Sequence, residues 1–184
     1  MTTVKCISPI DGSVYAERET LTQAAAQEAV ARARKAQKAW AARPLQERVD
    51  LVMGALKEIE NSTDRMTEEL AHQMGRPVRY GGEFGGLQER TSHMAKIASE
   101  ALAPKVIEES DAFTRKIMRE PHGVVFVVAP WNYPYMTANN TIGPALIAGN
   151  AVILKHASQT ILVGEHLADA YRAAGVPEEV FQNV

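Results

Sequence analysis

The 184-residue sequence lacks several features that mark secreted or membrane proteins. A single cysteine, Cys6, excludes an internal disulfide and is typical of a reducing compartment. The longest apolar run, Val124 to Pro130, is far shorter than the roughly 20 residues that cross a bilayer. The first ten residues, MTTVKCISPI, lack the continuous apolar run of a signal peptide. We therefore expect a cytoplasmic protein that has no membrane partner.

The chain also lacks an excess of one charge. Its 20 Lys and Arg residues against 22 Asp and Glu residues give a net charge of −2, and aromatic residues make up only 6%. Nucleic-acid surfaces need a basic patch, so we expect no nucleic-acid partner.

Cys6 has no histidine nearby in the sequence, which favours a structural thiol over a nucleophile. We expect no metal site, because none of the five histidines has ligand spacing with cysteine or carboxylate: His72, His93, His122, His156 and His166.

Helix-forming residues dominate the first hundred positions. An Asp-Gly pair within residues 7–16, ISPIDGSVYA, indicates a hairpin or tight turn. The alanine-rich segment at 20–43 predicts a helix that Thr20 or Thr22 caps, and Pro44 suits the first turn of the next helix. A third helix is expected to end at Gly75, and a fourth at about Ala101. We expect these four helices to form one layer that covers another element.

Two short segments between the predicted elements allow more than one interpretation. The run GGEFGG at 81–86 has no strand before it and no Lys-Ser or Lys-Thr pair after it, so it favours close helix packing over a phosphate loop. Residues 104–120 form two short extended runs around the polar turn EESD, with charged residues throughout. Such a ribbon is either a solvated hairpin or an arm that packs on another subunit.

The last third of the sequence alternates strands and helices. The continuous β-branched run GVVFVVAP at 123–130 predicts a strand that is covered on both faces of a parallel sheet. A helix over 137–148, a strand at 149–155, a helix over 158–175 and a strand at 180–184 follow. The predicted fold is α/β: a helical layer, a β-hairpin arm and the first β-α-β-α-β part of a doubly wound Rossmann-like sheet. Three parallel strands leave unpaired edges, so we expect an incomplete domain.

Ligands of doubly wound sheets lie beyond the carboxyl ends of the strands. The loop after the first predicted strand, 129–134, lacks the glycine pattern of a phosphate loop. Instead, Pro130 and Pro134 fix the backbone on either side of Asn132. The Asn132 carboxamide either donates to a developing oxyanion, or it caps the next helix or makes an Asx turn, and spacing leaves these interpretations open. Lys155, after the second strand, is either a donor to an adenosine ribose or a solvated lysine.

The segments GVVFVVAPWNYP, PALIAGNAVILKHASQT and AGVPEEVFQNV closely resemble the aldehyde dehydrogenase superfamily. Upstream, SPIDGSVYAE, AVARARKAQKAWAARPLQERVDLV and EELAHQMGRPV are similar to its amino-terminal helical part. The resemblance covers essentially the whole chain and implies the amino-terminal portion of a succinate-semialdehyde-dehydrogenase-like or broad-specificity enzyme. It divides the chain into a helical part of the cofactor-binding domain at 1–103, an oligomerisation hairpin at 104–121, and the first half of the NAD(P)-binding sheet at 122–184.

The resemblance implies a reaction in which a cysteine thiolate attacks an aldehyde, NAD or NADP accepts a hydride, and a glutamate-activated water releases the acid. By position, Asn132 matches the donor to the substrate oxygen, and Lys155 matches the lysine on the adenosine ribose. Tyr133 and Thr137 resemble residues that face the substrate tunnel. The resemblance places the cofactor groove at Val128, Ala129, Pro130, Trp131 and Asn132, with Ser158 beside Lys155.

Two departures from the family pattern matter. Ser158 stands where the family often has a glutamate that favours NAD, so both NAD and NADP are open. The nucleophilic cysteine and the general-base glutamate belong to the family's later half, and Cys6 lies in the wrong part of the fold to replace the first. We expect the isolated chain to be inactive and the full-length enzyme to be a homodimer or homotetramer. The alternative is a non-catalytic module that binds a nucleotide or another subunit.

Overall fold

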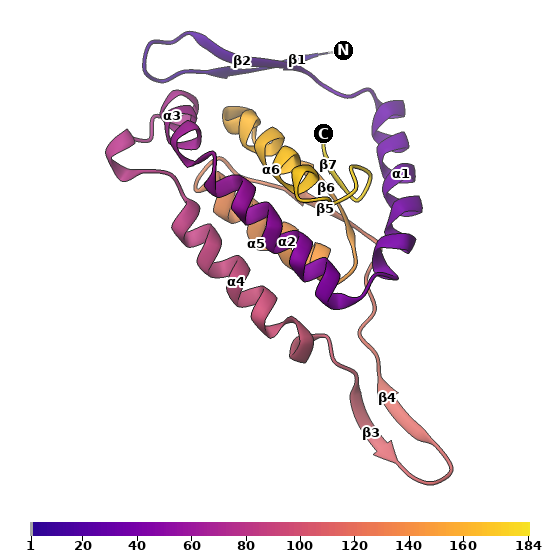
Figure 1. Cartoon of the computed structure of the whole chain (residues 1–184). Helices are drawn as coiled ribbons and strands as arrows, with labels where there is room; N and C mark the ends of the chain where they lie inside the picture. Colours follow the sequence, from indigo (N-terminus) through magenta and orange to yellow (C-terminus); the bar gives the residue numbers. More distant parts are fainter. Residues whose placement is uncertain (1) are drawn as a thin grey trace.

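The computed structural model describes residues 2–184 (Figure 1). Seven strands, six α-helices and two short 3₁₀ helices follow one another in these residues. In the amino-terminal part they are β1 (Thr3–Ile7), β2 (Val14–Glu19), α1 (Gln23–Ala41), α2 (Leu45–Glu60), α3 (Thr63–Met74), η1 (Val78–Tyr80) and α4 (Phe84–Ala101). The remaining elements are β3 (Lys105–Glu109), β4 (Thr114–Ile117), β5 (Val124–Val128), α5 (Pro134–Ile147), β6 (Ala151–Lys155), η2 (Ser158–Thr160), α6 (Ile161–Ala173) and β7 (Phe181–Asn183).

A three-stranded parallel sheet in the order β5-β6-β7 forms the centre of the molecule. Its register pairs Val128 with Lys155 and Leu154 with Asn183, so the three strands end at the same edge. The predicted β-α-β-α-β order is confirmed. The helix after β5 begins at Pro134, three residues before the predicted start, because proline suits the first helical turn.

The amino-terminal helices do not form the single layer that the sequence predicted. Helix α1 packs on one face of the sheet, whereas α2 and α4 pack on α5 and α6 over the other face (Figure 1). The buried residues of α1 are Ala29, Ala33 and Trp40, and the small side chain of Ala33 packs against Ala151 and Ile153 of β6. The buried stripe of α2 carries Val52, Leu56 and Ile59, which join the main core with the helices.

Strand β5 also departs from the prediction that both of its faces are covered. Val127 is buried, but Phe126 is 62% exposed and Val128 65% exposed. Val124, which lies on the same face as these two by the strand period, packs with Ala33 of α1. Helix α1 therefore covers the amino-terminal end of this face and leaves its carboxyl-terminal end open.

Short sequence patterns predicted several turns and helix ends correctly. Strands β1 and β2 form the expected hairpin, although they extend outward to Thr3 and Glu19. Thr22, rather than Thr20, caps α1 by accepting from Ala25 N, and Gly75 ends α3 in the left-handed region at φ 73°. In the GGEFGG run, a Cβ on Gly86 would lie 3.0 Å from Met136 Sδ, which supports close packing of α4 on α5.

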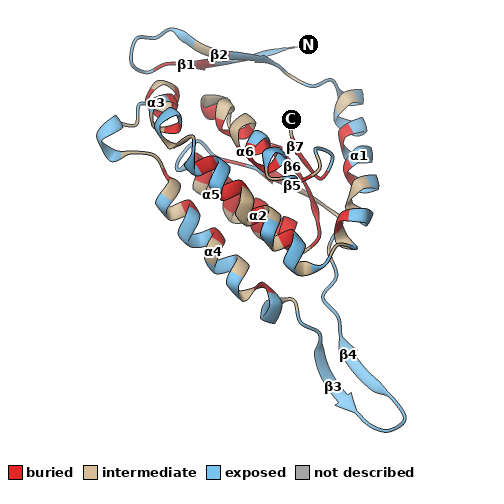
Figure 2. Cartoon of the chain, viewed as in Figure 1, coloured by how far each residue is buried: buried red, intermediate tan, exposed pale blue. Residues whose placement is uncertain are grey.

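Strands β3 and β4 form a hairpin that projects away from the body (Figure 1), and every residue in both strands is exposed (Figure 2). Its exposed apolar side chains include Val106, Ile107, Phe113 and Ile117. The structure thus has the predicted ribbon, and its role as an oligomerisation arm stays a prediction. Within residues 2–184, no helix combines the length and apolarity that crossing a membrane requires.

Candidate functional site

The site begins where β5 and β6 end side by side. Ala129 N donates to Lys155 O at 3.1 Å, one step beyond the Val128–Lys155 pair. Ala129 is buried, while Lys155 is exposed at the end of β6. The parallel register therefore brings together the two segments that the sequence singled out, although they are 26 residues apart along the chain.

A tight turn carries Asn132 from β5 into α5. Tyr133 has φ 48° and ψ 54°, and within residues 2–184 it is the only non-glycine residue with positive φ. The Thr137 hydroxyl donates to Asn132 O at 3.1 Å and to Tyr133 O as well. Left-handed backbone costs a tyrosine on the order of 1–3 kcal/mol, so these contacts must hold the turn in place.

The Asn132 side chain does not cap α5. Tyr133 is the N-cap residue and makes no side-chain cap bond. Among the described residues, the Asn132 carboxamide has no hydrogen-bond partner, and the residue is exposed. Neither the helix cap nor the Asx turn that spacing left open is therefore formed, and the carboxamide is free to donate to a ligand.

Two buried polar side chains, Glu83 and His156, contact the backbone at the start of α5. Glu83 Oε2 accepts from Met136 N at 3.0 Å, and burial raises the pKa of this carboxyl. His156 Nε2 lies 3.4 Å from Pro134 O, and its Nδ1 lies 3.2 Å from Thr160 Oγ1. Burial lowers the pKa of His156, which favours the neutral ring. Sequence reasoning missed both residues, because neither has a motif and their partners come from other elements.

Lys155 and Ser158 line a cavity of about 420 Å³ at the carboxyl end of the sheet. Val4 and Ile161 supply apolar wall, and Arg18 and Glu165 form a bidentate pair at 2.6 and 2.8 Å on the rim. The cavity thus offers an ammonium and a hydroxyl against an apolar wall. The amino-terminal hairpin helps to build it, which no sequence signal indicated because Arg18 and Glu165 are 147 residues apart.

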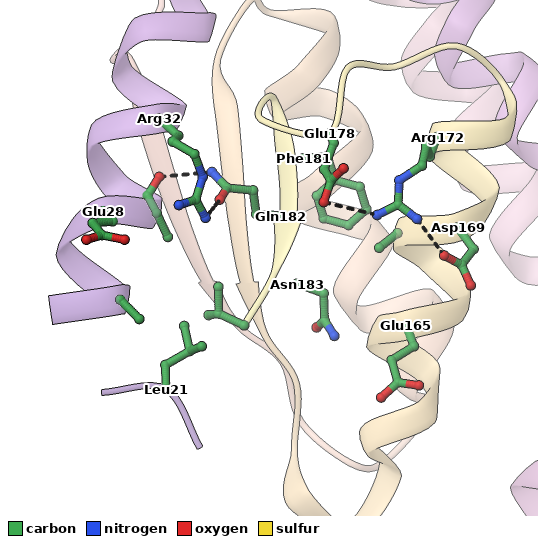
Figure 3. Close-up of a pocket in the computed structure, with 14 residues that line it drawn as sticks. Leu21, Glu28, Arg32, Glu165, Asp169, Arg172, Glu178, Phe181, Gln182 and Asn183 are labelled. Carbon is green, nitrogen blue, oxygen red and sulfur yellow. Dashed lines mark hydrogen bonds and ion pairs between the residues drawn. The ribbon is translucent and has the colours of Figure 1, made fainter. Parts of the chain in front are cut away.

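A second cavity of about 370 Å³ adjoins the first between α1, α6 and β7 (Figure 3). Three of its charged side chains pair with one another: Arg172 lies 2.8 Å from Asp169 and 3.7 Å from Glu178. Arg32 donates to Gln182 Oε1 at 3.1 Å, as the dashed line in Figure 3 marks. Because Arg172 and Arg32 already have partners, they offer less to a ligand than the Lys155 ammonium does in the first cavity.

The structure does not gather all of the predicted site residues into one cavity. Trp131 lines a separate cavity of about 440 Å³ with Met74 and Gln159. Asn132 and Tyr133 are exposed and line neither the Lys155 cavity nor the one in Figure 3. Residues 2–184 contain no group of three or more His, Cys, Asp or Glu side chains that could hold a metal ion.

Cys6 is a buried structural thiol, as predicted. It is fully buried, and its Sγ donates to Gln159 O at 2.9 Å. Burial raises the pKa of the thiol, which opposes formation of the thiolate that attacks a carbonyl. Cys6 therefore cannot serve as the nucleophile of this site.

The sequence model of the aldehyde dehydrogenase family matches residues 1–184. The chain belongs to the aldehyde dehydrogenase family. It is 33% identical to the N-succinylglutamate 5-semialdehyde dehydrogenase of Novosphingobium aromaticivorans over 85% of this chain and 33% of that protein. It is 30% identical to the 4,4'-diapolycopene aldehyde oxidase of a Methylomonas species over 99% of this chain and 36% of that protein.

Solved aldehyde dehydrogenase family structures confirm the predicted fold class. The NADP-dependent glyceraldehyde-3-phosphate dehydrogenase of Bacillus halodurans, solved with NADP, aligns over all of this chain and 40% of its own, with a TM-score of 0.91 and 31% identity. The NAD-dependent benzaldehyde dehydrogenase of Corynebacterium glutamicum aligns over all of this chain and 41% of its own, with a TM-score of 0.89 and 29% identity. The chain spans about a third of the length of the curated relatives it matches.

Proposed function

We propose that this chain is part of an NAD(P)-dependent aldehyde dehydrogenase that oxidises an aldehyde to a carboxylic acid. The observation that carries the proposal is the free Asn132 carboxamide on a braced turn beside the strand ends that carry Ala129 and Lys155. In acyl-transfer chemistry, a donor fixed at this kind of position stabilises the oxyanion by about 3 kcal/mol. Asn132 Nδ2 would donate to the aldehyde oxygen as negative charge develops there.

The residues near Lys155 fit an adenosine ribose. The Lys155 ammonium and the Ser158 hydroxyl can both donate to ribose hydroxyls, and the cavity that they line has apolar walls. Val128, Ala129, Pro130 and Trp131 would line the groove from there toward Asn132. The nicotinamide ring, when bound, would supply the hydride acceptor. Ser158 carries no negative charge to repel a 2′-phosphate, so the proposal includes both NAD and NADP.

The nucleophilic cysteine and the general-base glutamate would come from sequence outside these 184 residues. Cys6 is excluded by its burial and its bond to Gln159 O. Tyr133 and Thr137 would face the substrate. The Thr137 hydroxyl is already engaged with the carbonyls of Asn132 and Tyr133, so we assign it to the shape of the turn.

The proposal keeps the predicted division into a helical part at 1–103, an arm at 104–121 and the cofactor-binding sheet at 122–184. The exposed apolar side chains of β3 and β4 favour a homodimer or homotetramer in which this hairpin packs on a second subunit. A cytoplasmic location agrees with the single reduced cysteine.

A non-catalytic module remains the second candidate. The exposed side chains of Phe126 and Val128 favour it, because they form an apolar strip that another chain can cover. The two candidates differ in what Asn132 does. In the enzyme it contacts the reacting carbonyl, whereas in the module it has no role in any reaction.

The test compares the 184-residue chain with the polypeptide of its complete reading frame, each incubated with a panel of aldehydes and either NAD⁺ or NADP⁺. Formation of NAD(P)H is followed by absorbance. We expect turnover by the complete polypeptide and none by the 184-residue chain. Turnover by the short chain would contradict the claim that the nucleophile lies elsewhere, and a complete polypeptide without turnover would contradict the proposed function.

A further inference from the structure

Glu83 binds the amino terminus of a helix that begins about fifty residues later in the sequence. Its side chain is 1% exposed, and Oε2 accepts the backbone N–H of Met136, which lies in the first turn of α5. The first N–H groups of a helix need acceptors, and a carboxylate is a strong one because the helix dipole favours negative charge there. Glu83 therefore fixes the start of α5 to the start of α4.

Arg76 connects the same carboxylate to the turn that precedes α5. Its Nη1 lies 3.8 Å from Glu83 Oε1, which has no hydrogen-bond partner among the described residues. Its Nε donates to Gly81 O at 3.0 Å, and its guanidinium carbon lies 5.4 Å from the centre of the Tyr133 ring. Arg76 thus offsets the buried negative charge of Glu83. Its guanidinium also lies over the ring of Tyr133, the residue in the left-handed conformation.

Tyr133 transmits any movement of this pair to Asn132. The two residues are adjacent, and Tyr133 at φ 48° keeps its backbone only while its surroundings hold it. If the contacts of Glu83 and Arg76 are lost, Tyr133 can relax toward negative φ. That rotation changes the direction of the chain at Asn132, and with it the direction of the carboxamide.

The remote acceptor also explains why the Asn132 carboxamide is free. Asparagine is among the best local helix caps, and a helix start without an acceptor would favour turning Asn132 back onto the backbone of α5. Because Glu83 already accepts from Met136 N, that competing bond is not needed. The carboxamide can then stay directed away from the helix.

We propose that Glu83 and Arg76 are positioning residues that hold the Asn132 turn in the shape needed for oxyanion donation. The inference rests on the proposed function, since it gives these residues a task in aldehyde oxidation. It goes beyond that function by assigning part of the rate to two side chains in the amino-terminal helical region, neither of which lies next to Asn132 in the sequence.

The test uses the complete enzyme with three substitutions: Glu83→Ala, Glu83→Gln and the control Glu89→Ala, which changes an exposed glutamate of α4. Misplacing a catalytic group by about 1 Å costs up to about a hundredfold in rate, so we expect Glu83→Ala to lower kcat about tenfold. The KM for the cofactor should not change. Glu83→Gln should restore most of kcat, because its amide oxygen can accept from Met136 N. Glu89→Ala should behave as the parent does.

A double-mutant cycle with Asn132→Ala separates positioning from a general loss of structure. If Glu83 acts through Asn132, then Glu83→Ala should lower kcat by less than twofold once Asn132 is alanine. A further tenfold loss in that background would overturn the proposal. A folded Glu83→Ala variant with the parent's kcat would overturn it too.

Arg76→Met keeps the test decisive if Glu83→Ala does not fold. This variant leaves the bond from Met136 N to Glu83 intact and removes the cation above Tyr133. We expect kcat to fall severalfold, with Arg79→Met, at an exposed arginine of η1, as the control. An unchanged kcat in Arg76→Met would contradict the role of Arg76. A parent enzyme without aldehyde oxidation would overturn the proposed function and the inference together. If Asn132→Ala lowers kcat while Glu83→Ala and Arg76→Met keep the parent's kcat, only the inference is overturned.

Discussion

Asn132 and His156 both lie at the turn between β5 and α5, but they differ in burial and in their contacts. Asn132 is exposed and unbonded, while His156 is 5% exposed and lies near Pro134 O and the Thr160 hydroxyl. The first residue is available to a ligand. The second lies against the backbone of the turn and supports it.

We predict that acid destabilises the protein partly through His156. Burial lowers its folded pKa below the ordinary value of 6.5, so the folded state binds fewer protons than the unfolded state below that pH. Stability from the neutral ring is thus complete above about pH 6.5 and falls as the pH drops toward the folded pKa, by at most about 1.4 kcal/mol per pH unit. Burial shifts the pKa of His166 in the same direction.

Urea unfolding of the parent and of His156→Gln at pH 7.5 and pH 5.5 measures this effect. The parent should lose more stability between the two pH values than the variant does. His122→Gln, at an exposed histidine, should lose as much as the parent. Equal losses in the parent and in His156→Gln would contradict the assignment.

Ser158 gives a second prediction at this scale, on cofactor choice. In Ser158→Glu, a carboxylate enters the cavity beside Lys155, where a 2′-phosphate would lie. Like charges this close cost several kcal/mol, so kcat/KM for NADP⁺ should fall at least about tenfold while the value for NAD⁺ changes little. Steady-state kinetics of the complete enzyme with each cofactor, using Ser158→Ala as the control, checks it. An equal loss with both cofactors would place Ser158 away from the ribose.

At the scale of the elements, a buried polar chain joins three helices. The Tyr171 hydroxyl of α6 donates to Asn139 Oδ1 of α5 at 2.6 Å, and Asn139 Nδ2 donates to the Thr91 hydroxyl of α4 at 2.7 Å. All three residues are buried. Each helix therefore depends on the others for a hydrogen bond that water cannot replace.

We predict that Tyr171→Phe lowers the free energy of unfolding by about 1–3 kcal/mol, because it leaves Asn139 Oδ1 buried without its donor. Tyr80→Phe, which removes the hydroxyl of a 62% exposed ring, should change it by less than about 0.5 kcal/mol. Denaturant unfolding monitored by circular dichroism measures both. Equal effects of the two substitutions would mean that the buried chain does not stabilise the fold.

Local signals account for the elements that the sequence predicted well. Thr22 and Gly75 act on their own backbone, so the type of residue fixes the start of α1 and the end of α3. Layering was harder to predict. The apolar run of β5 gave no sign that α1 would cover only its first part, because that depends on where α1 ends relative to the strand.

In the candidate site too, contacts set by neighbouring strands were predictable from the sequence, and contacts between distant segments were not. The register of parallel strands places Ala129 beside Lys155, and this was predictable from the two strand segments alone. The contact from Met136 N to Glu83 and the pair between Arg18 and Glu165 were not, since their partners are 53 and 147 residues apart. The residues that we propose to contact a ligand lie in motifs of the sequence, whereas the residues that hold these motifs in place do not.

At the scale of the whole molecule, the sheet and the projecting hairpin present surfaces that a compact protein of this size would normally cover. Phe126 and Val128 on β5, and Phe113 and Ile117 around the hairpin, are all at least 45% exposed. The chain spans about a third of its curated relatives. Further protein from the same enzyme, or a second subunit, would cover these side chains under the proposed function.

The central claim is that Asn132 donates to the reacting carbonyl oxygen, and the kcat of Asn132→Ala tests it most directly. The variant is compared with the parent as the complete enzyme, with saturating aldehyde and cofactor. The account predicts that kcat falls about 10²–10³-fold, as for loss of one oxyanion donor, while the KM for the cofactor and the unfolding midpoint stay close to the parent values. A folded Asn132→Ala enzyme that keeps the parent's kcat would contradict it.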